Sequence, residues 1–150
     1  MSSTLVRQIR ASLLFAALAV AARMAPAHTY VLALGEAAGA TSYFGVICST
    51  EGGYESDHLY MQIRTDTASA ALVSAQVIKG TVASSTTDPV SGDAEASPVL
   101  RHRGGNGLYQ VLTTKTAPGA VTFTVTVHCL DVTGTQHTGI DAIVYQYQDR

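Results

Sequence analysis

Histidines carry most of the chemistry that this sequence could perform. His28 follows the small-residue tract Ala25-Pro26-Ala27, and removal of residues 1–27 on export would give it a free α-amine beside its imidazole. These two groups together can chelate one metal ion, and a set of nitrogen ligands favours Cu(II) over Ni(II) and Zn(II). The sequence therefore predicts a surface copper site built on His28. One or two other histidines would complete it, from the set His58, His128 and His137.

Signatures of catalysis are missing from the sequence. It contains no Gly-x-Ser-x-Gly elbow, no His-Glu-x-x-His, no Cys-x-x-Cys and no phosphate-binding glycine loop. Serine, aspartate and histidine all occur, but nothing in their spacing selects a triad. We therefore expect a binding protein rather than an enzyme. A histidine-brace oxygenase, which also begins with histidine, is the remaining enzymatic alternative.

Residues 1–27 have the layout of a secretory signal peptide. Two arginines precede twelve small or apolar residues, ASLLFAALAVAA, and the small-residue tract that ends at Ala27 follows them. A membrane anchor needs about 20 apolar residues to cross the hydrocarbon, so this run is too short. The sequence predicts a cleaved leader, a mature domain of residues 28–150, and a secreted or periplasmic location.

The charge balance excludes one class of partner. The leader holds three of the nine basic residues, so the mature chain keeps six against eleven acids, a formal net charge of −5. Such a chain offers no basic patch to the phosphate backbone of a nucleic acid. No stretch after residue 28 is apolar enough to span a membrane. We expect a soluble domain with a protein partner in the cell envelope.

Two cysteines, Cys48 and Cys129, are the only thiols in the chain. In an exported protein an even number of cysteines predicts a disulfide, and two cysteines allow one connectivity. The bridge would enclose 80 residues, and the chain-entropy model assigns such a bridge a stabilisation of about 4 kcal/mol.

Alternation of apolar and polar residues identifies the strands. In residues 121–129, VTFTVTVHC, valine, phenylalanine and cysteine occupy one face, and threonine and histidine the other. In HLYMQIRTD, Leu59, Met61 and Ile63 should face inward. No window after residue 28 shows a helical stripe. The other candidate strands are HTYVLAL, SYFGVIC, ALVSAQVIKG, PVLRHR, GLYQVLTT and IDAIVYQYQ.

Short strands, regular turns and one long-range disulfide predict an all-β fold, a single antiparallel immunoglobulin-like β-sandwich of about 7–8 strands. Tryptophan and a Tyr-x-Cys pattern are absent, which argues against a true immunoglobulin-superfamily member. Residues 81–98 are polar and acidic, and we expect one long surface loop that could hold an edge strand. The tract 104–107, Gly-Gly-Asn-Gly, is expected to form a hairpin turn. Arg101-His102-Arg103 would then lie at its exposed tip, where it could bind a carboxylate or phosphate.

The disulfide also indicates where the histidines lie. Bridged cysteines have Cα atoms within about 7 Å, so the strands that end near them should run in the same direction. The loops that follow these strands should then share one end of the sandwich, with His58, His128 and His137. In an immunoglobulin-like order the N-terminal strand starts at that end too, which would bring His28 there.

Two of these histidines, His58 and His128, are expected to face outward as accessible ligands. They would form a cross-strand pair if their strands are antiparallel neighbours. The alternative is that all of the histidines are ordinary solvated side chains of strands and loops. Three acids are expected beside them, namely Glu51, Glu55 and Asp57.

The run PVLRHRGGNGLYQVLTTKTAPGAVTFTVTVHC resembles the C-terminal half of small bacterial periplasmic sandwich domains of the FixH and YtkA-like group. The shared features are a glycine–aromatic strand at Gly107-Leu108-Tyr109, the turn Pro118-Gly119 and an alternating strand. The aromatic often expected after Pro-Gly is replaced here by Ala120 and Val121. A mature His28 is also similar to the first residue of CopC-type copper carriers, although no other metal motif of that family occurs. The resemblances imply a periplasmic sandwich and copper handling.

Two function classes follow from these observations. The first is a small exported metal-handling module that holds copper through His28 and passes it to another protein by ligand exchange. The second is a metal-free structural or recognition sandwich, such as an envelope accessory or adhesin-like domain. Its working surface would be a sheet edge or the 81–98 loop.

Overall fold

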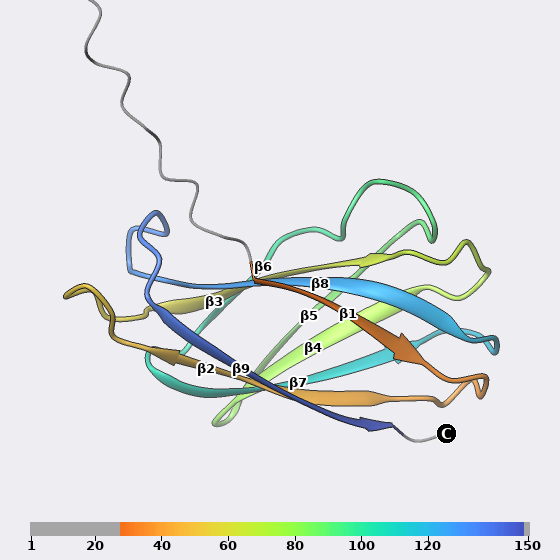
Figure 1. The fold of residues 1–150 in the computed structure, drawn as a ribbon, viewed down its shortest axis with the longest axis horizontal. Coiled ribbons are helices and arrows are strands. Elements are labelled where there is room, and N and C mark those ends of the chain that lie inside the picture. The colour runs from red at the N-terminus through yellow and green to blue at the C-terminus, as the bar shows by residue number, and fades with distance from the viewer. Residues whose placement is uncertain (1–27, 149–150) are drawn as a thin grey trace, which may run out of the picture.

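Nine strands and no helix make up the part of the chain that the structure describes (Figure 1). The computed structural model describes the backbone of residues 28–148 and the side chains of residues 28–141, so the expected signal peptide lies outside this range. None of these residues forms a helix long and apolar enough to cross a membrane. The strands are β1 (His28–Leu34), β2 (Ser42–Ser49), β3 (His58–Thr65), β4 (Val73–Lys79), β5 (Val82–Thr87), β6 (Leu100–Arg103), β7 (Gly107–Lys115), β8 (Val121–Leu130) and β9 (Gly139–Gln148).

The strands form two antiparallel sheets packed face to face. The four-stranded sheet has the order β1-β8-β3-β6, and the five-stranded sheet has the order β5-β4-β7-β2-β9. This confirms the predicted all-β sandwich. The strand number exceeds the expected 7–8 because β5 lies inside residues 81–98, the segment expected to be a loop that could hold an edge strand.

Alternation along the strands builds the core between the sheets. Leu59, Met61 and Ile63 of β3 are fully buried, as are Phe123 and its alternate neighbours on β8. The five-stranded sheet contributes Phe44, Val46, Val73, Val77, Tyr109 and Val111. Burial of each such side chain stabilises the fold by about 1.5–3 kcal/mol. The predicted inward faces of β3 and β8 are therefore confirmed.

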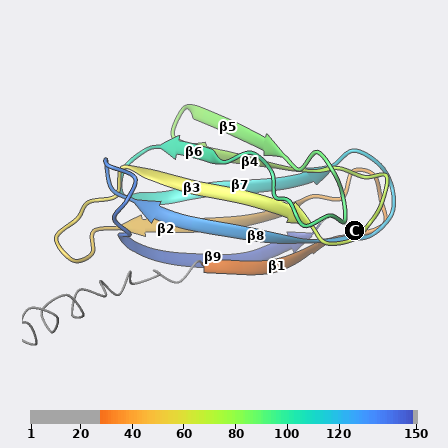
Figure 2. The same cartoon turned by 90° about the horizontal axis from the view of Figure 1, so that it is seen from above.

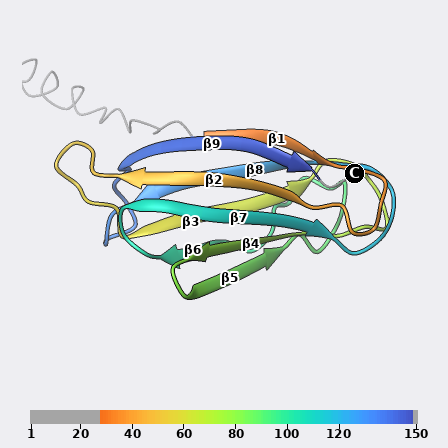
Figure 3. The same ribbon diagram turned by 90° about the horizontal axis from the view of Figure 1, so that it is seen from below.

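Each sheet has two edge strands, and these determine which parts of the fold are open to a partner. Figure 2 and Figure 3 show β5 as the outermost strand on one side of the sandwich, whereas β1 and β9 are the outermost strands of their respective sheets on the other side. The short strand β6 is the remaining edge. Figure 2 also shows that β2 and β8 run in the same direction, as the disulfide predicts.

The tract 104–107 is not a hairpin turn, contrary to expectation. It joins β6 of the four-stranded sheet to β7 of the five-stranded sheet, so it crosses between the layers. Gly104 allows close packing, because a Cβ there would lie 2.7 Å from Cδ of Lys79, whereas Gly105 and Gly107 have positive φ angles. Of the three residues expected at its exposed tip, Arg101 and Arg103 are exposed, but His102 is only 1% exposed.

Candidate functional site

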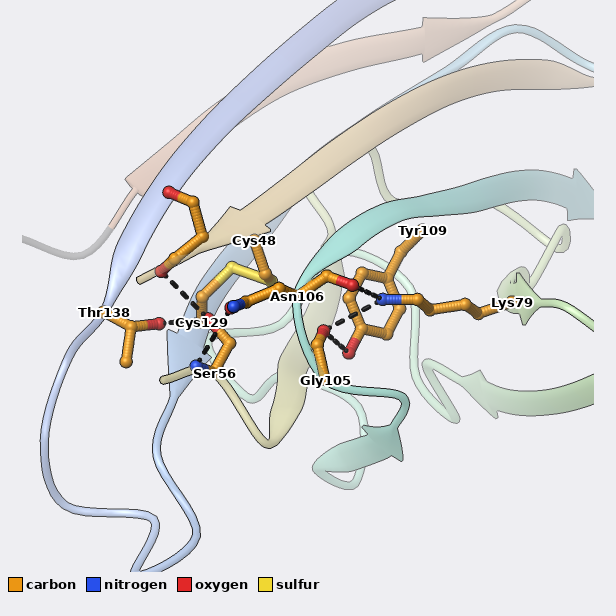
Figure 4. Close-up of a disulfide and its surroundings, with 9 residues drawn as sticks. Cys48, Ser56, Lys79, Gly105, Asn106, Tyr109, Cys129 and Thr138 are labelled. Carbon is orange, nitrogen blue, oxygen red and sulfur yellow. Dashed lines mark hydrogen bonds between the residues drawn. A yellow bond between two sulfur atoms is a disulfide. The ribbon is translucent and has the colours of Figure 1, made fainter. Parts of the chain in front are cut away.

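The loops that follow β2 and β8 meet at one end of the sandwich. Cys48 and Cys129 are bridged there, with Cα atoms 5.5 Å apart (Figure 4). The bridge joins β2 of the five-stranded sheet to β8 of the four-stranded sheet, so it ties the two layers together as predicted. We call this end, with its loops 50–57, 104–106 and 131–138, the disulfide pole.

A hydrogen-bond network holds the three loops of the disulfide pole together (Figure 4). The hydroxyl of Ser56 lies 2.5 Å from the hydroxyl of Thr138 and donates to the carbonyl oxygen of Ser49 at 3.2 Å. The side-chain oxygen of Asn106 accepts the N–H of Ser56 at 3.1 Å. The amide nitrogen of Asn106 donates to the hydroxyl of Thr50 at 2.9 Å. Because the partners come from different loops, the network fixes the loops relative to one another.

Two of the four predicted metal ligands are in contact at this pole. The rings of His128 and His137 meet edge to face, with centroids 4.6 Å apart. The other side of His128 meets the ring of Tyr60 at 5.3 Å. Nδ1 of His128 is buried and has no hydrogen-bond partner among the described residues. Burial lowers the pKa of His128, and the neighbouring His137 and His28 lower it further.

His58 is not the accessible ligand that the sequence predicts. It lies on the outer face of β3, but it is only 3% exposed because the 131–138 loop folds over it; a Cβ at Gly134 would lie 3.6 Å from its Cε1. Its Nδ1 lies 3.0 Å from a carboxylate oxygen of Asp57. The expected cross-strand pair is also wrong, since His58 stands opposite Leu130 and His128 opposite Tyr60.

β1 begins at the disulfide pole, as expected, but His28 is directed to the other face of its sheet. His28 stands opposite Val127, a core residue, so both side chains are on the side facing the other sheet. His128, one residue later on β8, is on the outer side. Within residues 28–141, no three His, Cys, Asp or Glu side chains form a group that could hold a metal ion. The structure thus brings His128 and His137 together and leaves His28 and His58 outside that contact.

The predicted acids Glu51, Glu55 and Asp57 lie in the loop 50–57 of the disulfide pole, and the oxygens of Asp57 already have partners. A shallow pocket of about 340 Å³ lies between the loops, and Glu55, Asp57 and Asp131 contribute to its lining. Asp57 accepts from Arg103 at 2.9 Å. Burial acts to raise the pKa of Asp131, but hydrogen bonds from the Thr133 hydroxyl and from backbone N–H groups lower it overall. The carboxylates of Asp57 and Asp131 therefore stabilise the loops of the pole.

A second polar cluster lies beside the crossing tract and was not predicted. Nζ of Lys79 sits 4.0 Å above the ring of Tyr109 and donates to the carbonyl oxygen of Gly105 at 2.9 Å. The Tyr109 ring also meets His102, whose Nδ1 pairs with the hydroxyl of Ser84 at 2.9 Å. Burial and the nearby Asp57 raise the pKa of Tyr109 to about 12. Little in the sequence indicates this cluster, because its residues come from four different strands, β4, β5, β6 and β7.

The outer face of the five-stranded sheet is uncharged over four of its strands. The two lysines of these strands, Lys79 and Lys115, are directed to the inner side. Leu108 stands opposite Ile47, and Leu112 opposite Tyr43. Asp141 of β9 lies at the rim of the face. The outward positions are Tyr43, Gly45, Ile47, Ser74, Gln76, Ile78, Ala83, Ser85, Thr87, Leu108, Gln110, Leu112 and Thr114.

Comparison of the chain with protein-family models, curated proteins and solved structures finds no match. The resemblances to FixH and YtkA-like domains and to CopC-type carriers therefore stay predictions. Since one fold hosts many functions, function has to be inferred from the surfaces of this chain.

Proposed function

We propose that this protein is an exported, non-catalytic recognition module that binds a partner protein through the outer face of its five-stranded sheet. The observation that carries the proposal is the absence of charge from that face over β2, β4, β5 and β7. The partner surface would itself be apolar and uncharged, because burial of an unpaired charge against this face would cost binding energy.

The composition of the face supports a protein partner. The cores of protein–protein interfaces are depleted in charged residues and enriched in aromatic and apolar ones. Leu108, at the disulfide-pole end of the face, is 47% exposed and stands opposite Ile47, and Leu112 and Tyr43 form a second apolar pair on the same two strands. The hollow lined by Gln76, Ala83, Ser84 and Ser85 at β4 and β5 is only about 150 Å³, smaller than the roughly 300 Å³ of small-molecule sites, which suits a protein better than a small molecule.

The disulfide supports the part of the proposal that places the protein in an oxidising compartment. The bridge between Cys48 and Cys129 is buried, and such bridges persist in oxidising environments such as the periplasm or the exterior of the cell. Export through the predicted leader, residues 1–27, would deliver the chain to such an environment.

The test is a matched pair of substitutions. Leu108→Glu introduces a carboxylate at an exposed apolar position of the face, and Val31→Glu introduces the same charge at a 70% exposed site on β1. We expect the first variant to bind the partner in an envelope extract more weakly, by about 3–5 kcal/mol, because the contact would bury an unpaired charge. The second variant should bind the partner like the parent. Binding would be measured by quantitative mass spectrometry of captured proteins. Equal capture by both variants would refute the proposal.

A second function, copper handling, is favoured by the contact between His128 and His137. Their rings are 4.6 Å apart, and the unpartnered Nδ1 of His128 is a nitrogen of the type that Cu(II) prefers. We propose that the two imidazoles would supply ligands, with the α-amine of His28 as a further ligand after cleavage.

Native mass spectrometry of the exported protein with one equivalent of Cu(II) tests this second function. We expect one retained copper on the parent and loss of copper from His137→Ala, with Tyr54→Ala as the control for an exposed change at the same pole. A parent spectrum without copper would exclude the role.

A further inference from the structure

β5 is an edge strand with none of the features that usually block edge-to-edge pairing. Its sequence, VASSTT, contains no charge and no proline, and its register against β4 is continuous. The other edges differ: β6 carries the exposed side chains of Arg101 and Arg103, and β9 has a register shift against β2. β1 is an edge of the other sheet, on the opposite side of the sandwich from β5, and no strand lies beyond β5 (Figure 2, Figure 3).

The ladder shows which backbone groups of β5 face outward. The N–H of Asp88 donates to the carbonyl oxygen of Val73 at 3.0 Å, which makes this a hydrogen-bonded pair. Since such pairs alternate along an antiparallel ladder, Thr86 and Ser84 also bond to β4. The alternate residues, Ala83, Ser85 and Thr87, must direct their N–H and C=O groups away from β4.

The other side of β4 agrees with this assignment. The N–H of Thr116 donates to the carbonyl oxygen of Leu72, so alternation makes Ser74, Gln76 and Ile78 the residues that bond to β7. Their partners on β5 are Thr87, Ser85 and Ala83. Three N–H and three C=O groups of β5 are therefore presented at the open edge. No hydrogen bond to them occurs within the described part of the chain.

We propose that two copies of this protein join edge to edge through β5, in antiparallel orientation, to form one continuous ten-stranded sheet. A two-fold axis at Ser85 would place Ser85 opposite Ser85 of the second copy. The same axis would place Ala83 opposite Thr87 in both directions. All three pairs are of the hydrogen-bonded type, so all six outward groups of each strand find partners. The occupant of the edge is thus a second copy of the same strand.

Charge and side-chain size favour this occupant over an unrelated strand. A two-fold contact places each residue opposite itself or its symmetry mate, so any charge near the axis would meet a like charge. β5 has none, and its outer side chains are alanine, serine and threonine, which are small enough to pack across the axis. Strand addition by a foreign peptide gains specificity from pockets for alternate side chains, and such small side chains supply none. The dimer is independent of the recognition role proposed above.

Sedimentation velocity of the exported protein, from micromolar to millimolar concentration, tests the dimer. We expect a monomer–dimer equilibrium for the parent. Ser85→Lys should leave only monomer, because two lysines would meet at the axis. Gln76→Lys, which adds the same exposed charge one strand further in and opposite Ser85, should dimerise like the parent. A monomeric parent, a dimer that survives Ser85→Lys, or equal weakening by both variants would overturn the proposal.

Cysteine cross-linking tests the register. Hydrogen-bonded pairs have Cα atoms about 5.5 Å apart, which a disulfide can span. Ser85→Cys should cross-link with itself, and Thr87→Cys should cross-link with Ala83→Cys but not with itself. Self-linking of Thr87→Cys without the mixed product would overturn the register. Loss of partner capture in Leu108→Glu, with its monomer–dimer equilibrium unchanged, would show that the two proposals succeed or fail separately, since Leu108 lies on β7 and away from the β5 edge.

Discussion

At the scale of single residues, buried histidines are the groups most sensitive to conditions. His102 lies in the core, with one ring nitrogen paired to Ser84 and the other without a partner among the described residues. Burial lowers its pKa, and the charge of Lys79 lowers it further. His128 is shifted in the same direction at the disulfide pole. Both imidazoles are therefore held neutral by the fold.

These two shifts predict that acid weakens the fold. In the unfolded chain both histidines titrate near 6.5, and in the folded chain they titrate lower, so the unfolded state binds more protons as the pH falls through 6.5. The stabilisation is complete above that value and is lost as the pH decreases toward the folded pKa. Urea unfolding at pH 7.5 and pH 5.5 should show a lower free energy of unfolding at pH 5.5.

The matched variant for this prediction is His102→Gln, which keeps a polar group beside Ser84 but cannot titrate. Its free energy of unfolding should change less between the two pH values than that of the parent. An unchanged pH dependence would show that His102 does not contribute. The same measurement on His128→Gln shows how much of the pH dependence comes from the histidine at the disulfide pole rather than from His102 in the core.

At the scale of elements, the alternation of apolar and polar residues was sufficient to predict most of the strands. It was not sufficient to predict the geometry of the site. The inward faces of β3 and β8 were predictable because one face of each strand is packed in the core. β5 was not assigned as a strand because only Val82, Ser84 and Thr86 face inward, and no apolar alternation results. The layer crossing at 104–107 depends on which sheet each flanking strand joins, and spacing does not show this.

The site was predictable in position but not in detail. The disulfide correctly placed the loops 50–57 and 131–138 at one end. Whether a histidine is accessible depends on residues distant in sequence: the turn at Gly134 covers His58. Whether His28 and His128 share a face depends on register, and the pairing of His28 with Val127 puts them on opposite faces.

The bridge between β2 and β8 predicts a large effect on stability. Cys48 and Cys129 are separated by 81 positions, so removal of the bridge restores much conformational entropy to the unfolded chain. Cys48→Ala with Cys129→Ala should lose about 4 kcal/mol of unfolding free energy. The measurement is denaturant unfolding, and the parent under reducing conditions serves as the control. A loss below about 1 kcal/mol would contradict the chain-entropy account.

At the scale of the whole molecule, the proposed contacts use different parts of one sheet. The recognition face is the outer side of β2, β4, β5 and β7, and the proposed dimer uses the edge of β5. Dimerisation would therefore place two uncharged faces side by side in a single surface. Two linked faces would bind a repetitive partner more tightly than one, through effective concentration alone.

The position of the disulfide has a mechanical consequence. At the disulfide pole the bridge adds a covalent side-chain link between the two layers, whereas at the far end only the chain turns such as 35–41 and 116–120, and polar contacts such as Lys115 to the carbonyl oxygen of Gly35, connect them. Local separation of the layers should then be more restricted beside Cys48 and Cys129 than at these turns. Amide hydrogens near the turns should exchange with solvent before those beside the bridge.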